Sequence, residues 1–125
     1  MKLRLFEQNE YIDKLTWVVL QLLKEMNIKF NPTVVSEAIK YHPKSPSLST
    51  IVEVLQSWGI PCAAFEDSIE GFADVQYPSI AQLESNEFVL LLKSEKGTVC
   101  YLDPDKGKRG MPLDEFDRIW SGKII

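Results

Sequence analysis

The apolar residues in the first half of the chain recur every three or four positions, which is the spacing of one helical face. The first such series is Tyr11, Leu15, Val18, Leu22 and Met26. Asn9 or Asp13 can cap the start of this helix, and Asn27 is a plausible end. The pattern therefore predicts a first long helix that begins close to Lys14.

Two more helices are predicted before the middle of the chain. Asn31 followed by Pro32 is a helix start, because proline is tolerated at the first helical position, and the apolar pattern continues to residue 39. Residues 42–47 contain two prolines and are expected to form a loop. Residues 48–58 then place apolar side chains on one face and stop at Gly59, a common helix C-terminal residue.

In the second half the spacing changes to that of strands. Residues 88–92 are apolar throughout, which indicates a central strand buried on both faces. Lys96-Gly97 predicts a hairpin turn, and residues 112–116 predict a short helix. The other expected strands are 62–65, 80–83, 98–102, about 109–111 and 123–125. Helices first and a mostly antiparallel sheet second predict an α+β domain.

Length, composition and charge exclude several classes of function. A length of 125 residues fits a single domain, 1–125, with 45% hydrophobic and 26% charged residues. A net charge of -4 argues against nucleic-acid binding. No apolar run approaches the roughly 18 residues that a membrane span needs. An acid at Glu7 interrupts any signal-peptide core, so we expect a cytoplasmic location, and we expect no cofactor and no metal.

Cys62 and Cys100 could form one disulfide at most. Without a signal peptide, a reducing compartment is favoured and both are expected to be small buried hydrophobes. Whether either has a redox role is left open.

The spacing of a few polar residues carries a family resemblance. Gln8 stands six residues before Lys14, Asp103 follows Glu87 by sixteen, and Trp120-Ser121-Gly122 stands near the end. In this order the residues resemble the bacteriocin-processing (C39) cysteine peptidases, a papain-like family. The resemblance implies a papain-like fold, with N-terminal helices packed on an antiparallel sheet.

The same resemblance implies a role for each position. Gln8 matches the glutamine that binds the oxyanion, and Asp13 precedes the nucleophile. Lys14 occupies the nucleophilic cysteine position, Glu87 the histidine base position and Asp103 the position of the residue that orients the base. Turn chemistry alone also explains Asp103, and Lys14 and Glu87 could be ordinary solvated charges.

The departures from the family pattern predict an inactive enzyme. A lysine cannot perform thiol attack, Glu87 cannot replace an imidazole, and Leu15 stands where the family has glycine. We expect Lys14 and Glu87 to form an ion pair in place of the catalytic thiolate and imidazolium. The alternative is an active peptidase with an unorthodox nucleophile, since a desolvated lysine can act as one.

Two contexts are implied by the resemblance. Such domains occur at the cytosolic N-terminus of peptide-exporting ABC transporters and of vitamin K epoxide reductase-like membrane proteins; the segments 42–48 and 58–60 resemble the second group. The chain is thus expected to be the N-terminal domain of a larger membrane protein, at the inner face of the membrane. It is expected to bind a peptide, such as a leader peptide, without cleaving it, or else to pack only on its parent protein.

Overall fold

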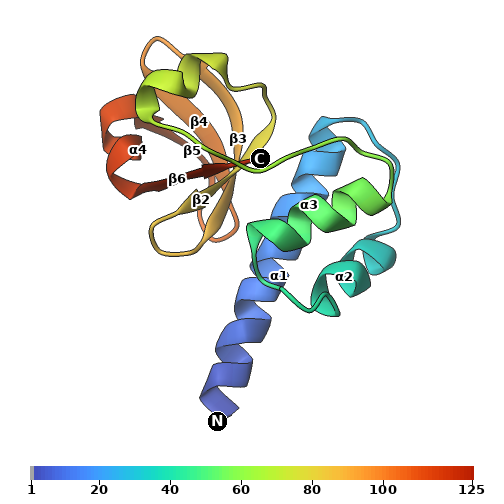
Figure 1. The fold of residues 1–125 in the computed structure, drawn as a ribbon. Coiled ribbons are helices and arrows are strands. Elements are labelled where there is room, and N and C mark those ends of the chain that lie inside the picture. The colour runs from blue at the N-terminus through green and yellow to red at the C-terminus, as the bar shows by residue number, and fades with distance from the viewer. Residues whose placement is uncertain (1) are drawn as a thin grey trace.

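The computed structural model describes the backbone of residues 2–125 and the side chains of 10–72 and 75–125. Three helices come first: α1 (Lys2–Glu25), α2 (Pro32–Lys40) and α3 (Leu48–Ser57). A six-stranded antiparallel sheet follows in the order β1-β6-β2-β3-β4-β5. The predicted α+β class, with N-terminal helices packed on an antiparallel sheet, is confirmed. Figure 1 shows the helices and the sheet as two lobes, joined by the segment after α3.

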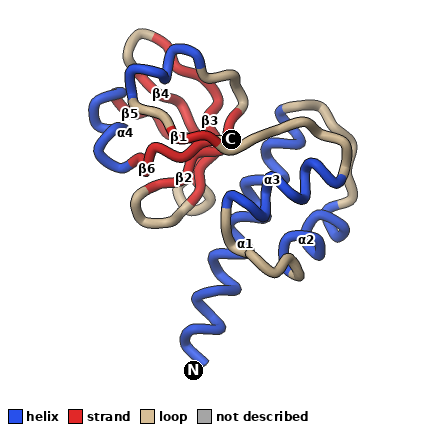
Figure 2. The backbone as a smooth tube through the Cα atoms, viewed as in Figure 1, coloured by secondary structure: helices blue, strands red, loops and turns tan. Residues whose placement is uncertain are grey.

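The six strands and two short helices make up the second half of the described chain. They are β1 (Phe65–Glu66), η1 (Ile69–Asp74), β2 (Ser79–Leu83), β3 (Phe88–Glu95), β4 (Thr98–Asp103), β5 (Gly107–Pro112), α4 (Leu113–Ile119) and β6 (Trp120–Ile124). Figure 2 distinguishes these helices from the strands. The expected strand at 62–65 is mostly wrong, because ladder pairing with β6 starts only at Phe65.

Strand β3 lies inside the sheet, between β2 and β4, and is buried on both faces as predicted. Side chains alternate across a strand. Phe88 and Leu90 therefore enter the cluster under the helices, whereas Val89 and Leu91 enter a second cluster with α4 and η1. The sheet thus forms the middle layer, with α1–α3 over one face and η1 and α4 over the other.

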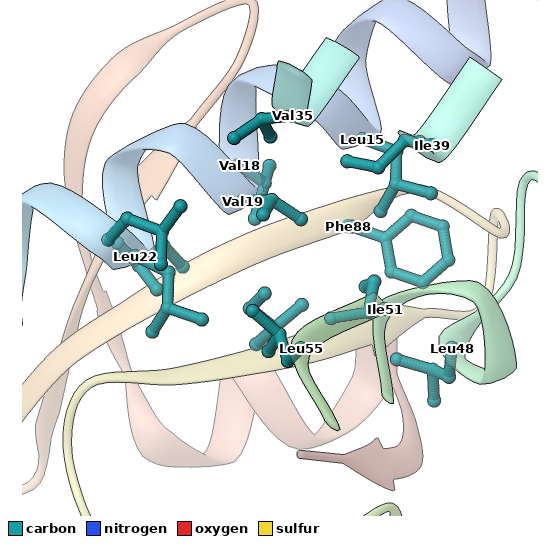
Figure 3. Packing of buried hydrophobic residues seen from close by; sticks show 13 residues of the cluster. Leu15, Val18, Val19, Leu22, Val35, Ile39, Leu48, Ile51, Leu55 and Phe88 are labelled. Carbon is teal, nitrogen blue, oxygen red and sulfur yellow. The ribbon is translucent and has the colours of Figure 1, made fainter. Parts of the chain in front are cut away.

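Local signals explain two of the helix starts. The Asn31 side chain accepts hydrogen bonds from the N–H groups of Thr33 (2.9 Å) and Val34 (3.4 Å), so it caps α2 as predicted. Ser47 caps α3 by accepting the N–H of Thr50 at 3.2 Å. Both helices contribute apolar side chains to one cluster with α1, and Figure 3 shows Ile39 of α2 and Ile51 of α3 on either side of the Phe88 ring.

Within residues 2–125, no helix combines the length and the apolarity needed to cross a membrane.

Candidate functional site around Lys14

Lys14 lies in the interior of α1, twelve residues beyond the first helical residue, Lys2. The expectation that it lies at the start of the helix is wrong. No glycine or proline interrupts residues 2–13, so the helix continues past the two residues that could have capped it. The effect of the helix dipole is confined to the first turn, so it does not act on Lys14.

Two other sequence-predicted positions belong to the same helix. Gln8 is helical in its backbone, but its side chain lies outside the described residues. Asp13 is exposed, and its neighbour Leu15 is fully buried. In this helix, therefore, position 14 faces the edge of the core and position 13 faces solvent.

The ammonium group of Lys14 has two anionic neighbours. Its Nζ lies 2.9 Å from Asp105 Oδ2 and 3.3 Å from Glu10 Oε1. The hydrogen bond from Lys14 to Asp105 raises the pKa of Lys14 above its ordinary value; burial opposes the rise, and Glu10 adds to it. At neutral pH the group is therefore a cation without a lone pair for nucleophilic or base chemistry.

The predicted ion pair between Lys14 and Glu87 is wrong. Among the described residues, the ionic partners of Lys14 within 4.0 Å are Glu10 and Asp105. Glu87 is half-buried just before β3, where its carbonyl accepts the N–H of Leu83 at 2.8 Å. Instead, Asp105 in the turn after β4 places its carboxylate beside Lys14.

Sequence reasoning identified neither partner, although each has a local signal. Glu10 precedes Lys14 by four residues, the spacing of side chains that meet on one helical face. Asp105 follows the predicted Asp103 by two residues in the same turn. What the sequence does not show is which of the two carboxylates in that turn faces α1.

Asp103 is buried and organises this turn. Its Oδ1 accepts the N–H groups of Asp105 at 2.8 Å and Lys106 at 3.1 Å, an Asx-type turn. Burial raises the pKa of Tyr101, and the charge of Asp103 adds to the rise. The aspartate expected to orient a base thus holds in place the backbone that presents Asp105 to Lys14.

Leu15 is the residue for which the family resemblance expects a glycine. It is fully buried in the cluster that also contains Phe88, the residue after Glu87. Figure 3 shows the Leu15 side chain beside the Phe88 ring. Lys14 and Glu87 thus each directly precede a residue of the same core cluster. The side chain of Leu15 fills space that a glycine at this position would leave empty.

A groove of about 490 Å³ lies beside these residues. Its lining surface is about half polar and half apolar, and it is formed by α1, the loop before α3 with the start of that helix, β2, the β2–β3 turn and β6. The lining residues are Tyr11, Pro46, Ser47, Leu48, Ser49, Gln82, Ser85, Asn86 and Lys123. The Tyr11 ring centre lies 6.0 Å from Lys14 Nζ, and Asn86 directly precedes Glu87, so the groove adjoins these two predicted site residues.

His42 lies outside the predicted site, but its contacts hold the loop before α3, and the end of that loop lines the groove. Its Nε2 lies 2.7 Å from Glu53 Oε2, and its Nδ1 accepts the N–H of Lys44 at 3.1 Å. Lys44 Nζ also reaches Glu53 Oε1, at 3.3 Å. These contacts tie the loop before α3 to the helix that follows.

The chain has two cysteines, Cys62 and Cys100. Both cysteines are free and half-buried, and burial raises the pKa of Cys62. In the part of the chain whose side chains are described, no group of three or more His, Cys, Asp or Glu residues is placed to hold a metal ion.

A helical lobe packed on an antiparallel sheet, with a groove between them, is the architecture of a papain-like peptidase domain. A model of the peptidase C39 family matches residues 2–125, and the chain belongs to this family. No curated protein matches the chain significantly.

Solved structures of transporter peptidase domains share the fold. One is a double glycine motif protease from an AMS/PCAT transporter in complex with the leader peptide, with a TM-score of 0.79, 18% identity and coverage of 89% of this chain and 80% of that chain. A second is the peptidase domain of Streptococcus ComA, a bi-functional ABC transporter involved in quorum sensing, at 0.68 and 17%, covering 82% of each chain. A third is the N-terminal peptidase C39 like domain of a toxin secretion ATP-binding protein from Vibrio parahaemolyticus, at 0.71 and 12%, covering 89% and 92%.

Proposed function

We propose that this chain is a C39 peptidase-like domain that binds a peptide without hydrolysing it. The observation that carries the proposal is the ion pair of Lys14 with Asp105. The family resemblance places Lys14 where the nucleophilic cysteine is expected. A protonated amine cannot attack a peptide carbonyl, and the charge of Asp105 favours the protonated form. A catalytic thiol–imidazole pair also needs a histidine as its base, and the carboxylate of Glu87 cannot replace that imidazole.

The groove beside Lys14 is the proposed peptide site. Hydroxyl and amide side chains line it, and these groups can pair with the backbone of an extended peptide. A relative of the same fold was solved in complex with its leader peptide, which supports a peptide as the ligand class. We further propose that the domain belongs to a larger membrane protein and works at the cytoplasmic face of the membrane. A peptide exporter is the favoured parent and a vitamin K epoxide reductase-like protein is the alternative.

The test is a binding titration followed by mass spectrometry of the peptide. A fluorescein-labelled synthetic peptide with a double-glycine site is titrated with the purified domain, and the mixture is then incubated for a day. We expect saturable anisotropy and an intact peptide. Time-dependent cleavage would instead establish the unorthodox peptidase, and absence of binding would favour a domain that only packs on its parent protein.

A matched pair of variants locates the binding site. Ser49→Trp places a large side chain in the groove, whereas Thr33→Trp makes a similar change at the same position, the second residue, of α2. Both side chains are exposed, so neither substitution disturbs the core. Ser49→Trp is expected to weaken binding at least tenfold and Thr33→Trp to leave it unchanged. Equal affinities for the two variants would remove the groove from the proposal.

A further inference from the structure

A second and larger cavity opens at the other end of α1. Its volume is about 620 Å³, within the range of ligand sites. Leu22 lines it from α1, Met26 from the turn that follows α1, and Phe65 from β1. At 1.5 Å per residue, the rise from Tyr11 to Leu22 is roughly 16 Å, so this cavity is separate from the groove beside Lys14.

The lining of the cavity is mostly apolar and partly open to solvent. Aliphatic side chains of Leu55, Ile60 and Ile80 form its inner wall. At its rim, Met26 is 42% exposed and Phe65 is 60% exposed. Large apolar side chains that border a cavity and remain exposed indicate a surface that a partner covers.

The electrostatics of the rim favour a cation. Among the residues whose side chains are described, Asp67 is the one acidic or basic residue in the lining, and no basic group lies within ion-pair distance of it. It packs against Gly71, which has no side chain to cover it. Residues 66–74 hold four acids and no base, a charge of -4 that equals the net charge of the whole chain.

We propose that this cavity, lined by Met26, Phe65 and Asp67, binds a basic amphipathic peptide segment of a partner protein. Large apolar side chains of the segment enter the cavity, and a neighbouring lysine or arginine pairs with Asp67. The acidic segment 66–74 argues against the other occupants. A second copy of this chain would bring two such segments together, and an anionic lipid surface would be repelled.

The test uses a labelled 14-residue peptide of leucine and lysine in an amphipathic helical pattern, with a leucine–glutamate peptide of the same pattern as the comparison. Asp67→Asn removes the rim charge, and Asp117→Asn makes the same change on the exposed face of α4. Met26→Ser removes an apolar rim contact, and Val34→Ser makes a comparable change on α2, where the side chain is also exposed. Binding is followed by fluorescence anisotropy at 50 and 300 mM salt.

We expect the leucine–lysine peptide to bind and the leucine–glutamate peptide not to bind. Asp67→Asn should weaken the affinity for the leucine–lysine peptide about two- to fivefold, the range of a solvent-exposed ion pair. Met26→Ser should weaken it about fivefold. The two control variants should match the wild type, and higher salt should weaken binding to the wild type more than binding to Asp67→Asn.

Several results would overturn the inference. These are no binding of the lysine peptide, equal binding of the glutamate peptide, or equal effects of Asp67→Asn and Asp117→Asn. Sedimentation of the free domain as a dimer that Met26→Ser dissociates would identify a second copy as the occupant and would also overturn it. The groove variant Ser49→Trp should leave this binding intact, so failure here and failure of the proposed function are distinguishable.

Discussion

Lys14 Nζ lies 2.9 Å from the carboxylate of Asp105, a residue of the turn that follows β4. The pair joins the helical lobe to the sheet at the place where the family resemblance expects a nucleophile. The side chain of Lys14 is 23% exposed and that of Asp105 50% exposed, so water screens the attraction in part. The first prediction concerns the strength of this pair.

A double-mutant cycle with Lys14→Met and Asp105→Asn should give a coupling of up to about 1 kcal/mol in the free energy of unfolding, the range of partly exposed pairs. The same cycle on Lys93 and Glu95, which are 3.5 Å apart and more exposed, should give a smaller value. Urea unfolding measures both. Zero coupling for Lys14 and Asp105 would show that the pair does not hold the lobes together.

The contribution of Lys14 to the free energy of unfolding should depend on pH. The pKa of Lys14 is raised in the folded state, so its stabilisation is fully present below the unfolded lysine pKa, about 10.4. That stabilisation is lost as the pH rises from this value through the folded pKa. The difference in unfolding free energy between wild type and Lys14→Met should be constant from pH 7 to 10 and shrink above it. A difference that shrinks below pH 9 would contradict the raised pKa.

Asp103→Ala should destabilise the domain by about 2 kcal/mol, because a buried charged acceptor of two backbone N–H groups is lost. Asp103→Asn keeps an oxygen acceptor and should cost less. Because the turn positions Asp105, the coupling between Lys14 and Asp105 should also fall in the Asp103→Ala background. Thermal unfolding of wild type and the two variants tests the order of stabilities.

Restoring the family's glycine should be costly. Leu15→Gly removes a fully buried side chain and places glycine inside a helix, so we expect a loss of about 3–6 kcal/mol. Leu15→Met, which conserves volume, should cost under about 1.5 kcal/mol. A tolerated Leu15→Gly would show that the space beside Phe88 can close again.

Gly122, in the Trp120-Ser121-Gly122 segment, has a positive φ of 89°, and a Cβ there would lie 3.1 Å from the Asp67 carbonyl oxygen. Gly97 has a φ of 75°, and a Cβ added to it would meet no atom within 4 Å, so this position isolates the backbone strain. Gly97→Ala should cost about 1–2 kcal/mol and Gly122→Ala more. Equal losses in urea unfolding would show that the Asp67 backbone moves away without cost.

Much of the fold followed from local pattern. The helices after Asn31 and before Gly59, the buried strand at 88–92 and the hairpin at Lys96-Gly97 were all predicted, because periodicity, caps and turns act over a few residues. The family resemblance also proposed positions 14 and 103 as site positions, and their catalytic ancestry stays a prediction. The resemblance rests on the order and spacing of polar residues.

Tertiary structure decided the rest. The sequence alone determined the helical faces, the α+β order and the family, because each depends on neighbours in the chain or on motif spacing. It did not determine that α1 continues back to Lys2, that Asp105 rather than Glu87 meets Lys14, or that a cavity opens between Met26 and Phe65. These outcomes depend on how closely distant segments pack, since an ion pair or a cavity changes with shifts of a few ångströms that local pattern does not encode.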